Sequence, residues 1–177
     1  MVRKILAAGA LATAALLTAS AAGAAIAPAK VSIASFAQLK TPLPYPYDET
    51  LSAKATNAAV AKARARAAKA HKLLLIDLGG NWCGDCRILT GTLELPEMKA
   101  WVARHYELVS VDVGRFDKNL QVPGDYGIHY RLEGVPALLV VDPKTNKLLD
   151  KGHESALQDA RSMTPQALAD WLAQFPR

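Results

Sequence analysis

Residues 73–86 read LLLIDLGGNWCGDC, and this stretch decides the fold of the 177-residue chain. Its first six residues are five apolar side chains and one aspartate, followed by two glycines. That pattern is typical of a short strand buried on both faces. The last five residues, 82–86, carry both cysteines of the chain. The stretch therefore predicts a buried central strand that delivers a Cys-x-x-Cys pair to the start of a helix.

Helices and strands alternate on either side of this stretch. The pattern predicts a helix at 49–71, a strand at 73–78, a helix from Cys83 past Leu89, a helix at 96–106, a strand at 107–113, a helical turn at 126–131, a strand at 136–141 paired in a hairpin with 147–151, and a closing helix capped by Thr164 and Pro165. This order indicates an α/β fold in which a central mixed β-sheet has helices on both faces.

The polar connection at 114–125 has two possible interpretations. Its charged side chains, and those next to it, are expected to be exposed: Asp112, Arg115, Asp117, Lys118 and Asp125. Such a loop is either a surface that recognises a partner or a solvated insertion, and loop statistics favour the insertion.

The composition excludes several classes of protein. A hydrophobic fraction of 51% with 21% charged residues is incompatible with a wholly disordered chain. Two cysteines are too few for a scaffold held by disulfides. The net charge of +5 comes from scattered lysines and arginines, without the clustering with aromatic residues that nucleic-acid binding requires. We expect a folded protein that does not bind nucleic acid.

The first 27 residues have the three parts of a secretory signal peptide. A short basic start (1–4) precedes an uncharged stretch rich in Ala and Leu (5–17) and a run of small residues (20–27). An uncleaved membrane anchor is the alternative, but Ala, Gly, Ser and Thr gain little from lipid. We expect cleavage after Ala24, and a mature protein that is periplasmic or secreted, in an oxidising compartment without a stable membrane span.

Prolines mark the boundary of the mature domain. Pro42, Pro44 and Pro46 occupy alternate positions, which favours extended backbone. We expect residues 25–47 to form a Pro-rich arm or linker and residues 48–177 to form the domain.

The position of the cysteines favours redox chemistry. Residues three apart on a helix share one face, so the sulfurs of Cys83 and Cys86 can bond. Cys83 would lie among the unpaired N–H groups at the positive end of the helix, where a thiolate is stabilised, and would be the nucleophile. Cys86, one turn deeper, would resolve the mixed disulfide that Cys83 forms.

Two other functions of a Cys-x-x-Cys pair are less consistent with the sequence. A zinc site needs four ligands, and the four histidines are scattered without suitable spacing. A purely structural disulfide that closes so small a loop contributes little. We therefore expect no metal and no cofactor other than the dithiol itself.

The motif resembles the active site of the thioredoxin superfamily. Trp82-Cys83-x-x-Cys86 matches the family signature, Asp77 falls where thioredoxins carry a buried aspartate, and residues 134–140 (GVPALLV) resemble the cis-proline segment. The resemblance covers about residues 73–151 and implies a thioredoxin-like fold.

It also implies roles for three further residues. Asp77 would take the proton of Cys86; alternatively it caps the loop at the end of the strand. A cis Pro136 would present the backbone of Val135 to an extended substrate; alternatively it is a trans proline that starts a strand. Trp82 would offer an apolar landing surface beside Cys83; alternatively it is a core residue.

The sequence also departs from the family pattern. Gly84 and Asp85 lie between the cysteines, where thioredoxins have a proline before the second cysteine, and we expect them to tune the reduction potential. The Asp85 carboxylate opposes thiolate formation at Cys83 and favours a reductant, unless Arg87 neutralises it. Gly79 and Gly80 replace bulkier residues and would widen the approach to the site.

The sequence therefore predicts an exported thiol–disulfide oxidoreductase that reduces protein disulfides. Its expected partners are disulfide-containing proteins and a dithiol electron donor, either membrane-bound or periplasmic, and it is expected to be a monomer. Three alternatives stay open: an oxidase or isomerase that uses the same residues, a binding module that does not need the dithiol, and a specialised reductant for metal or haem pathways.

Overall fold

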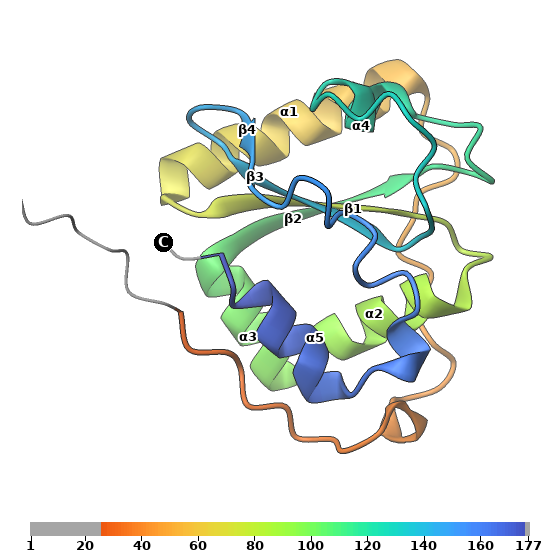
Figure 1. Cartoon of the computed structure of the whole chain (residues 1–177), viewed down its shortest axis with the longest axis vertical. Helices are drawn as coiled ribbons and strands as arrows, with labels where there is room; N and C mark the ends of the chain where they lie inside the picture. The colour runs from red at the N-terminus through yellow and green to blue at the C-terminus, as the bar shows by residue number, and fades with distance from the viewer. Residues whose placement is uncertain (1–25, 176–177) are drawn as a thin grey trace, which may run out of the picture.

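The computed structural model describes residues 26–175, and Figure 1 shows helices above and below one central sheet. Its elements in chain order are η1 (Phe36–Gln38), α1 (Ala53–Ala70), β1 (Leu73–Gly79), α2 (Gly84–Leu93), α3 (Pro96–His105), β2 (Tyr106–Asp112), α4 (Gln121–Gly124), β3 (Ala137–Asp142), β4 (Lys147–Leu148), η2 (Ala160–Ser162) and α5 (Pro165–Leu172). The expected signal peptide lies outside the described residues. Within residues 26–175, no helix combines the length and the apolar composition needed to cross a membrane.

The sheet has the strand order β2-β1-β3-β4 and is mixed. β1 pairs in parallel with β2 and antiparallel with β3, so it is central, as its continuous apolar sequence predicts. All seven of its residues are buried. This pairing aligns Asp77 of β1 with Ser110 of β2 and Leu138 of β3.

Alternate residues of β1 enter two separate cores. Leu73 and Leu75 pack with α2, α3 and α5 on one face, whereas Leu74, Ile76 and Leu78 pack with α1 on the other. Side chains of a strand alternate between its faces, so one apolar strand fills both cores. Figure 1 shows the same two layers, with α1 and the short α4 opposite α2, α3 and α5.

The helix boundaries follow local capping signals. Ser52 caps α1 and accepts the backbone N–H of Ala55, so the helix begins four residues later than the expected start at 49. Its charged side chains are exposed, and small residues face the sheet. Thr164 caps α5 and accepts the backbone N–H of Ala167, which confirms the predicted closing helix.

Two predicted elements differ in the structure. The helical turn expected at 126–131 is wrong: the short helix α4 lies earlier, at Gln121–Gly124, and Gly127 then adopts a positive φ of 80°. The last strand, expected at 147–151, is paired only at Lys147–Leu148. Beyond that point the Leu149 N–H still donates to the Val140 carbonyl at 2.8 Å, and the Asp150 carboxylate accepts the Val140 N–H at 2.9 Å, so a side chain takes the place of the next backbone acceptor.

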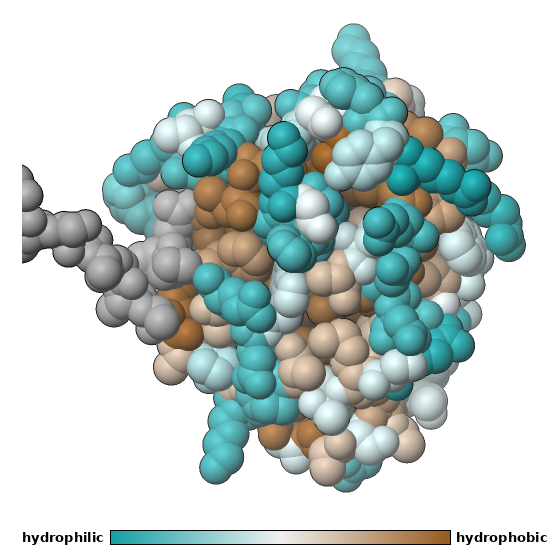
Figure 2. Space-filling view, in the orientation of Figure 1, coloured by the Kyte–Doolittle hydropathy of each residue, from teal (hydrophilic) through white to brown (hydrophobic). Residues whose placement is uncertain are grey.

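The N-terminal arm runs along the surface of the domain, past α3 and α5, before it reaches α1 (Figure 1). It is not a loose linker, because it buries Ala29, Leu39 and Tyr47. On the face seen in Figure 2, hydrophobic patches are separated by hydrophilic side chains.

Candidate active site around the disulfide

The two cysteines form a disulfide at the start of α2, where the sequence places them. Cys83 is the N-cap of the helix, and its Sγ accepts the backbone N–H of Cys86 at 3.1 Å. The Cα atoms are 5.3 Å apart. Cys83 is 5% exposed and Cys86 is fully buried, so a substrate can approach only Cys83.

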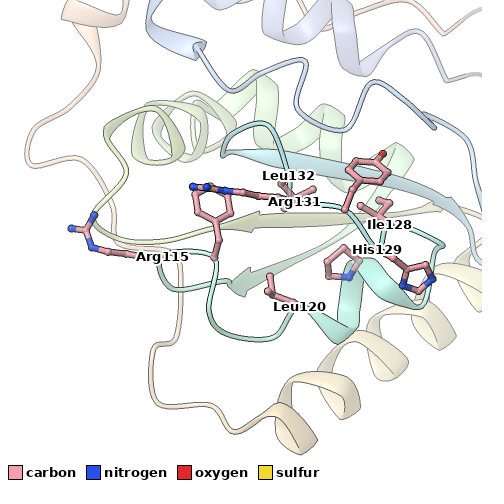
Figure 3. A pocket seen from close by; sticks show the side chains of 9 residues that line it. Arg115, Leu120, Ile128, His129, Arg131 and Leu132 are labelled. Carbon is pink, nitrogen blue, oxygen red and sulfur yellow. The ribbon is translucent and has the colours of Figure 1, made fainter.

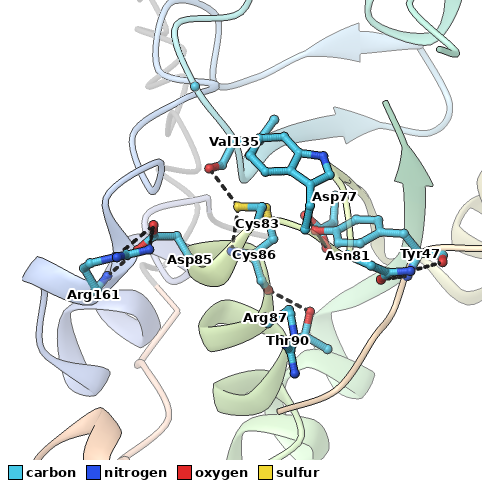
Figure 4. The surroundings of a disulfide bond; sticks show 12 residues. Tyr47, Asp77, Asn81, Cys83, Asp85, Cys86, Arg87, Thr90, Val135 and Arg161 are labelled. Atoms are coloured by element: carbon cyan, nitrogen blue, oxygen red, sulfur yellow. Dashed lines mark hydrogen bonds and ion pairs between the residues drawn. A yellow bond between two sulfur atoms is a disulfide. The ribbon is translucent and has the colours of Figure 1, made fainter. Parts of the chain in front are cut away.

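The loop before β3 faces the outer sulfur. The Val135–Pro136 peptide bond is cis, and the carbonyl oxygen of Val135 lies 3.3 Å from Cys83 Sγ (Figure 4). Pro136 directly precedes β3, which pairs with β1 and fixes the loop opposite the disulfide. The backbone of Val135 therefore borders the point at which a substrate sulfur would meet Cys83.

Trp82 lies at the surface beside Cys83. Its side chain is 45% exposed, so the alternative of a core tryptophan is wrong. The indole N–H donates to the Gly114 carbonyl at 2.7 Å, and the guanidinium of Arg115 lies 4.8 Å from the ring centroid. The ring is thus fixed in place while one face remains available for contact.

Asp77 is 1% exposed, and the hydrogen bonds that its carboxylate accepts come from Tyr47 and Ser110 and not from the loop after β1. Its two carboxylate oxygens each accept the hydroxyl of Tyr47 at 3.0 Å (Figure 4). Burial raises the pKa of Asp77 to about 7, against the opposing effect of hydrogen bonds from Tyr47 and Ser110. A carboxyl group with this pKa can both accept and release a proton near neutral pH.

Tyr47 comes from the Pro-rich arm, and its backbone is clamped by Asn81. The Tyr47 N–H donates to Asn81 Oδ1 at 3.2 Å, and Asn81 Nδ2 donates to the Tyr47 carbonyl at 2.8 Å. Burial and the nearby charge of Asp77 raise the pKa of the Tyr47 phenol, so the hydroxyl stays protonated.

The two glycines after Asp77 do not widen the approach to the site, contrary to the expectation from sequence. A Cβ on Gly79 would collide with the Tyr47 hydroxyl and with Cys86 Sγ, and a Cβ on Gly80 would collide with the indole of Trp82. The space left by the missing side chains is therefore occupied by the protein itself.

Asp85 is paired with Arg161 of η2, and not with Arg87 as the sequence suggested. The guanidinium donates from Nη2 at 2.6 Å and from Nε at 2.9 and 3.0 Å, and the Arg161 backbone N–H donates at 2.9 Å (Figure 4). Burial raises the pKa of Asp85, but the hydrogen bonds and charge of Arg161 outweigh it and lower the pKa overall.

Arg87 is instead a tie between α2 and the arm. It donates to the carbonyl oxygens of Leu43 at 2.7 Å and Pro44 at 3.1 Å, and its guanidinium lies 3.9 Å from the ring centroid of Tyr45. The side chain that follows Cys86 thus holds the arm against the active-site helix.

The loop after β2 forms a groove of about 610 Å³ next to the site. Its lining includes Phe116, Leu120, Ile128 and Arg131, and none of the residues discussed above except Arg115. Figure 3 shows Arg115 pointing away from the other labelled side chains.

Asp112, expected to be exposed, is buried, and its carboxylate accepts hydrogen bonds from Lys118 Nζ at 3.2 Å and from the Gly114 backbone N–H at 2.9 Å. The other four charged residues of the connection are exposed as predicted.

Sequence reasoning missed Tyr47, Asn81 and Arg161. Tyr47 contacts Asp77, Asn81 contacts the arm and Arg161 contacts Asp85, and none of the three belongs to a recognisable sequence motif.

Within residues 26–175, no group of three or more His, Cys, Asp and Glu side chains is arranged to hold a metal ion.

Known proteins resemble this chain in sequence and structure. Residues 54–143 match a family model described as thioredoxin-like. The structure of a disulphide isomerase from Xylella fastidiosa Temecula1 is 37% identical and superposes with a TM-score of 0.65, covering 74% of this chain and 96% of that one. The C-terminal domain of DsbD from Neisseria meningitidis, in its oxidised form, is 23% identical with a TM-score of 0.39, covering 53% and 81%. No curated protein sequence matches.

Proposed function

Since the chain belongs to the thioredoxin-like family and carries its Cys-x-x-Cys pair as a disulfide, it is a thiol–disulfide oxidoreductase, and we propose that it reduces protein disulfides outside the cytoplasm. The proposed location rests on the signal-peptide pattern of residues 1–24. No cofactor beyond the dithiol takes part in the reaction.

One observation carries the assignment as a reductant: Cys83 Sγ faces the Val135 carbonyl oxygen at 3.3 Å. A carbonyl oxygen accepts a hydrogen bond from a thiol and repels a thiolate. The Cys86 N–H has the opposite effect, and the Asp85 charge is matched by Arg161. The Cys83 thiolate is thus only moderately stabilised. A strong oxidant needs a strongly stabilised reduced form, so this site favours a reducing potential.

The proposed cycle uses the residues around the disulfide in turn. Reduced Cys83 attacks one sulfur of a substrate disulfide, and the other sulfur leaves as a thiolate. An extended substrate segment lies against Val135 and Pro136, with Trp82 as an apolar contact. Cys86 gives its proton to Asp77 and attacks Cys83 Sγ, which forms the enzyme disulfide and releases the second substrate thiolate. A dithiol donor, either membrane-bound or periplasmic, then reduces the enzyme.

Isomerisation is a second candidate, because the similar structure from Xylella fastidiosa is that of a disulphide isomerase. An isomerase needs Cys83 to attack and then to be displaced by another thiol of the same substrate. Attack of Cys86 on the mixed disulfide, assisted by Asp77, releases the substrate before its disulfides can rearrange. A buried base for Cys86 therefore supports net dithiol exchange over isomerisation.

The reduction potential of the Cys83–Cys86 pair tests the proposal. The protein without residues 1–24 is equilibrated with glutathione mixtures, and the free thiols are counted. We expect a value near that of thioredoxin, about −270 mV, or lower, whereas a value near about −120 mV would make the protein an oxidant. If the Cys83–Cys86 pair cannot be reduced and oxidised reversibly, the protein would be a binding module that does not need the dithiol. Recovery of a scrambled disulfide protein by C86S as fast as by the unchanged protein would favour the isomerase.

A further inference from the structure

The N-terminal arm supplies a side chain to the proton-accepting part of the site. Tyr47 is 3% exposed, although it follows a segment with exposed neighbours such as Tyr45, which is 64% exposed. Its hydroxyl donates to the carboxylate of Asp77 and lies beside Cys86, because the hydroxyl oxygen and Cys86 Sγ both lie within 3.0 Å of the point where a Gly79 Cβ would be. The phenol thus contacts the aspartate next to the buried sulfur.

Several contacts hold the arm in this position. Asn81 clamps the backbone of Tyr47 with two hydrogen bonds, and Arg87 binds the carbonyl oxygens of Leu43 and Pro44. Asn81 lies in the loop before the disulfide and Arg87 follows Cys86 directly, so both ties come from the active-site segment itself. The absent side chain at Gly79 makes room for the phenol.

We propose that Tyr47 is a positioning residue that orients the Asp77 carboxylate and favours its ionised form, so that it can remove the proton of Cys86 when Cys86 resolves the mixed disulfide. The inference rests on the dithiol exchange proposed above. It makes the arm a functional part of the active site.

The step balances with groups that are present. The Cys86 S–H proton moves to the Asp77 carboxylate, the Cys86 sulfur forms a bond to Cys83 Sγ, and the bond from Cys83 to the substrate sulfur breaks. The electron pair leaves with the substrate thiolate, and Asp77 later returns its proton to water. Tyr47 keeps its own proton throughout and acts only through Asp77.

The groups that face Asp77 determine whether loss of the Tyr47 hydroxyl raises or lowers the pKa of Asp77. Tyr47 of the arm donates to it, Ser110 of β2 donates a second hydrogen bond, and Cys86 of α2 becomes a titrating neighbour once it is reduced. Asp112 acts on the Tyr47 phenol. A donor that favours the ionised form lowers the pKa of Asp77 against its burial, so loss of the Tyr47 hydroxyl raises it.

The test separates the two thiol steps with a small probe, 5,5′-dithiobis-(2-nitrobenzoate). The reduced protein without residues 1–24 releases one thionitrobenzoate when Cys83 attacks and a second when Cys86 resolves the mixed disulfide. Y47F removes only the hydroxyl, and Y45F makes the same change two residues away on the exposed side of the arm. Both phases are recorded from pH 5 to pH 9, and thermal unfolding confirms that each variant is folded.

We expect the acid limb of the second phase to move upward by about one pH unit in Y47F, with a slowing of about 5- to 10-fold at pH 7. The first phase stays unchanged, and Y45F matches the unchanged protein in both phases. A second phase in Y47F with the same pH dependence as the unchanged protein overturns the proposal. So does an equal slowing of both phases, which would indicate a general structural role.

A second variant keeps the inference testable if Y47F does not fold. N81A releases the backbone clamp and should produce a smaller upward shift of the same limb; no shift in a folded N81A contradicts the proposal. Because the probe reports both phases without a protein substrate, failure to reduce protein disulfides would overturn the proposed function but not this inference.

Discussion

Asp77 lies on the strand that leads to the disulfide and Asp85 lies between the two cysteines, but the protein surrounds these carboxylates in opposite ways. Asp77 is buried and accepts a hydrogen bond from a neutral phenol, and burial raises its pKa to about 7. Asp85 accepts hydrogen bonds from a guanidinium at the surface, and its pKa is lowered overall. One carboxyl group can therefore exchange a proton near neutral pH, and the other is a fixed negative charge with a fixed counter-charge.

The difference shows that the partner and the solvent decide what a carboxylate does. A neutral donor in a buried site leaves the carboxyl titratable, whereas a cation holds it ionised. In the proposed mechanism, Asp77 exchanges a proton with Cys86. Asp85 would act only through its charge on the reduction potential of Cys83.

The largest expected effect concerns the rate of turnover. D77N removes the base for Cys86, and we expect kcat for reduction of a disulfide-bonded protein to fall about 100-fold at pH 7, in the range typical of a lost general base. D85N removes a charge that moves no proton, so its effect should stay below about threefold. Steady-state assays of the two variants measure both values. Equal losses of kcat in D77N and D85N would contradict the view that only Asp77 transfers a proton.

The next effect concerns the space that the arm occupies. A methyl group on Gly79 meets the Tyr47 hydroxyl and Cys86 Sγ, so we expect G79A to lose about 2–3 kcal/mol of unfolding free energy. G124A is the matched control, because its Cβ would lie 3.7 Å from the nearest atom of His129. Urea unfolding should place G124A within about 1 kcal/mol of the unchanged protein. Equal unfolding free energies of G79A and G124A would show that the arm can move away from Gly79 at little energetic cost.

The elements with local signals could be predicted from the sequence. The strand β1 follows from an unbroken apolar run, α2 from the cysteines after the glycine loop, and α5 from Thr164 and Pro165 at its start. Cys83 and Cys86 follow from their place at the start of a helix, whereas Asp77 is predicted from the resemblance to thioredoxins. Such features depend on neighbours in the chain, and neighbours in the chain can be read from sequence.

The partners of the two aspartates could not be predicted, because they come from distant segments. Tyr47 and Tyr45 lie in the same repeated Pro-Tyr pattern, yet one is buried and the other exposed. Only the docking of the arm distinguishes them. Arg161 lies 76 residues from Asp85 on a short helix without a strong sequence signal. The nearest basic residue in the chain, Arg87, was the natural candidate and was wrong.

A third effect appears in stability as a function of pH. The raised pKa of Asp77 means that the folded protein keeps its proton up to about pH 7, whereas the unfolded chain releases it near pH 4. The stabilisation present at low pH is therefore lost as the pH rises towards 7. D77N carries no charge, so we expect it to be more stable than the unchanged protein by about 2 kcal/mol at pH 8.

The measurement is urea unfolding of both proteins at pH 8 and at lower pH. The advantage of D77N should shrink towards zero as the pH falls to about 4, where both side chains are neutral or nearly so. An advantage that does not change with pH would mean that Asp77 does not titrate in this range, and its part in proton transfer would fail with it.

The smallest effect concerns the reduction potential and tests the other side of the comparison. R161Q leaves the Asp85 charge unmatched beside Cys83, which disfavours the Cys83 thiolate and hence the reduced form. We expect the potential to become more negative by about 10–20 mV, a small change because the guanidinium is exposed to solvent. D85N leaves Arg161 unmatched instead and should shift the potential in the opposite direction. The double variant R161Q/D85N removes both charges, so its potential should return close to the original value. Glutathione titrations at low and high salt measure all four proteins, and shifts of R161Q and D85N in the same direction would contradict the view that this pair acts through its charge.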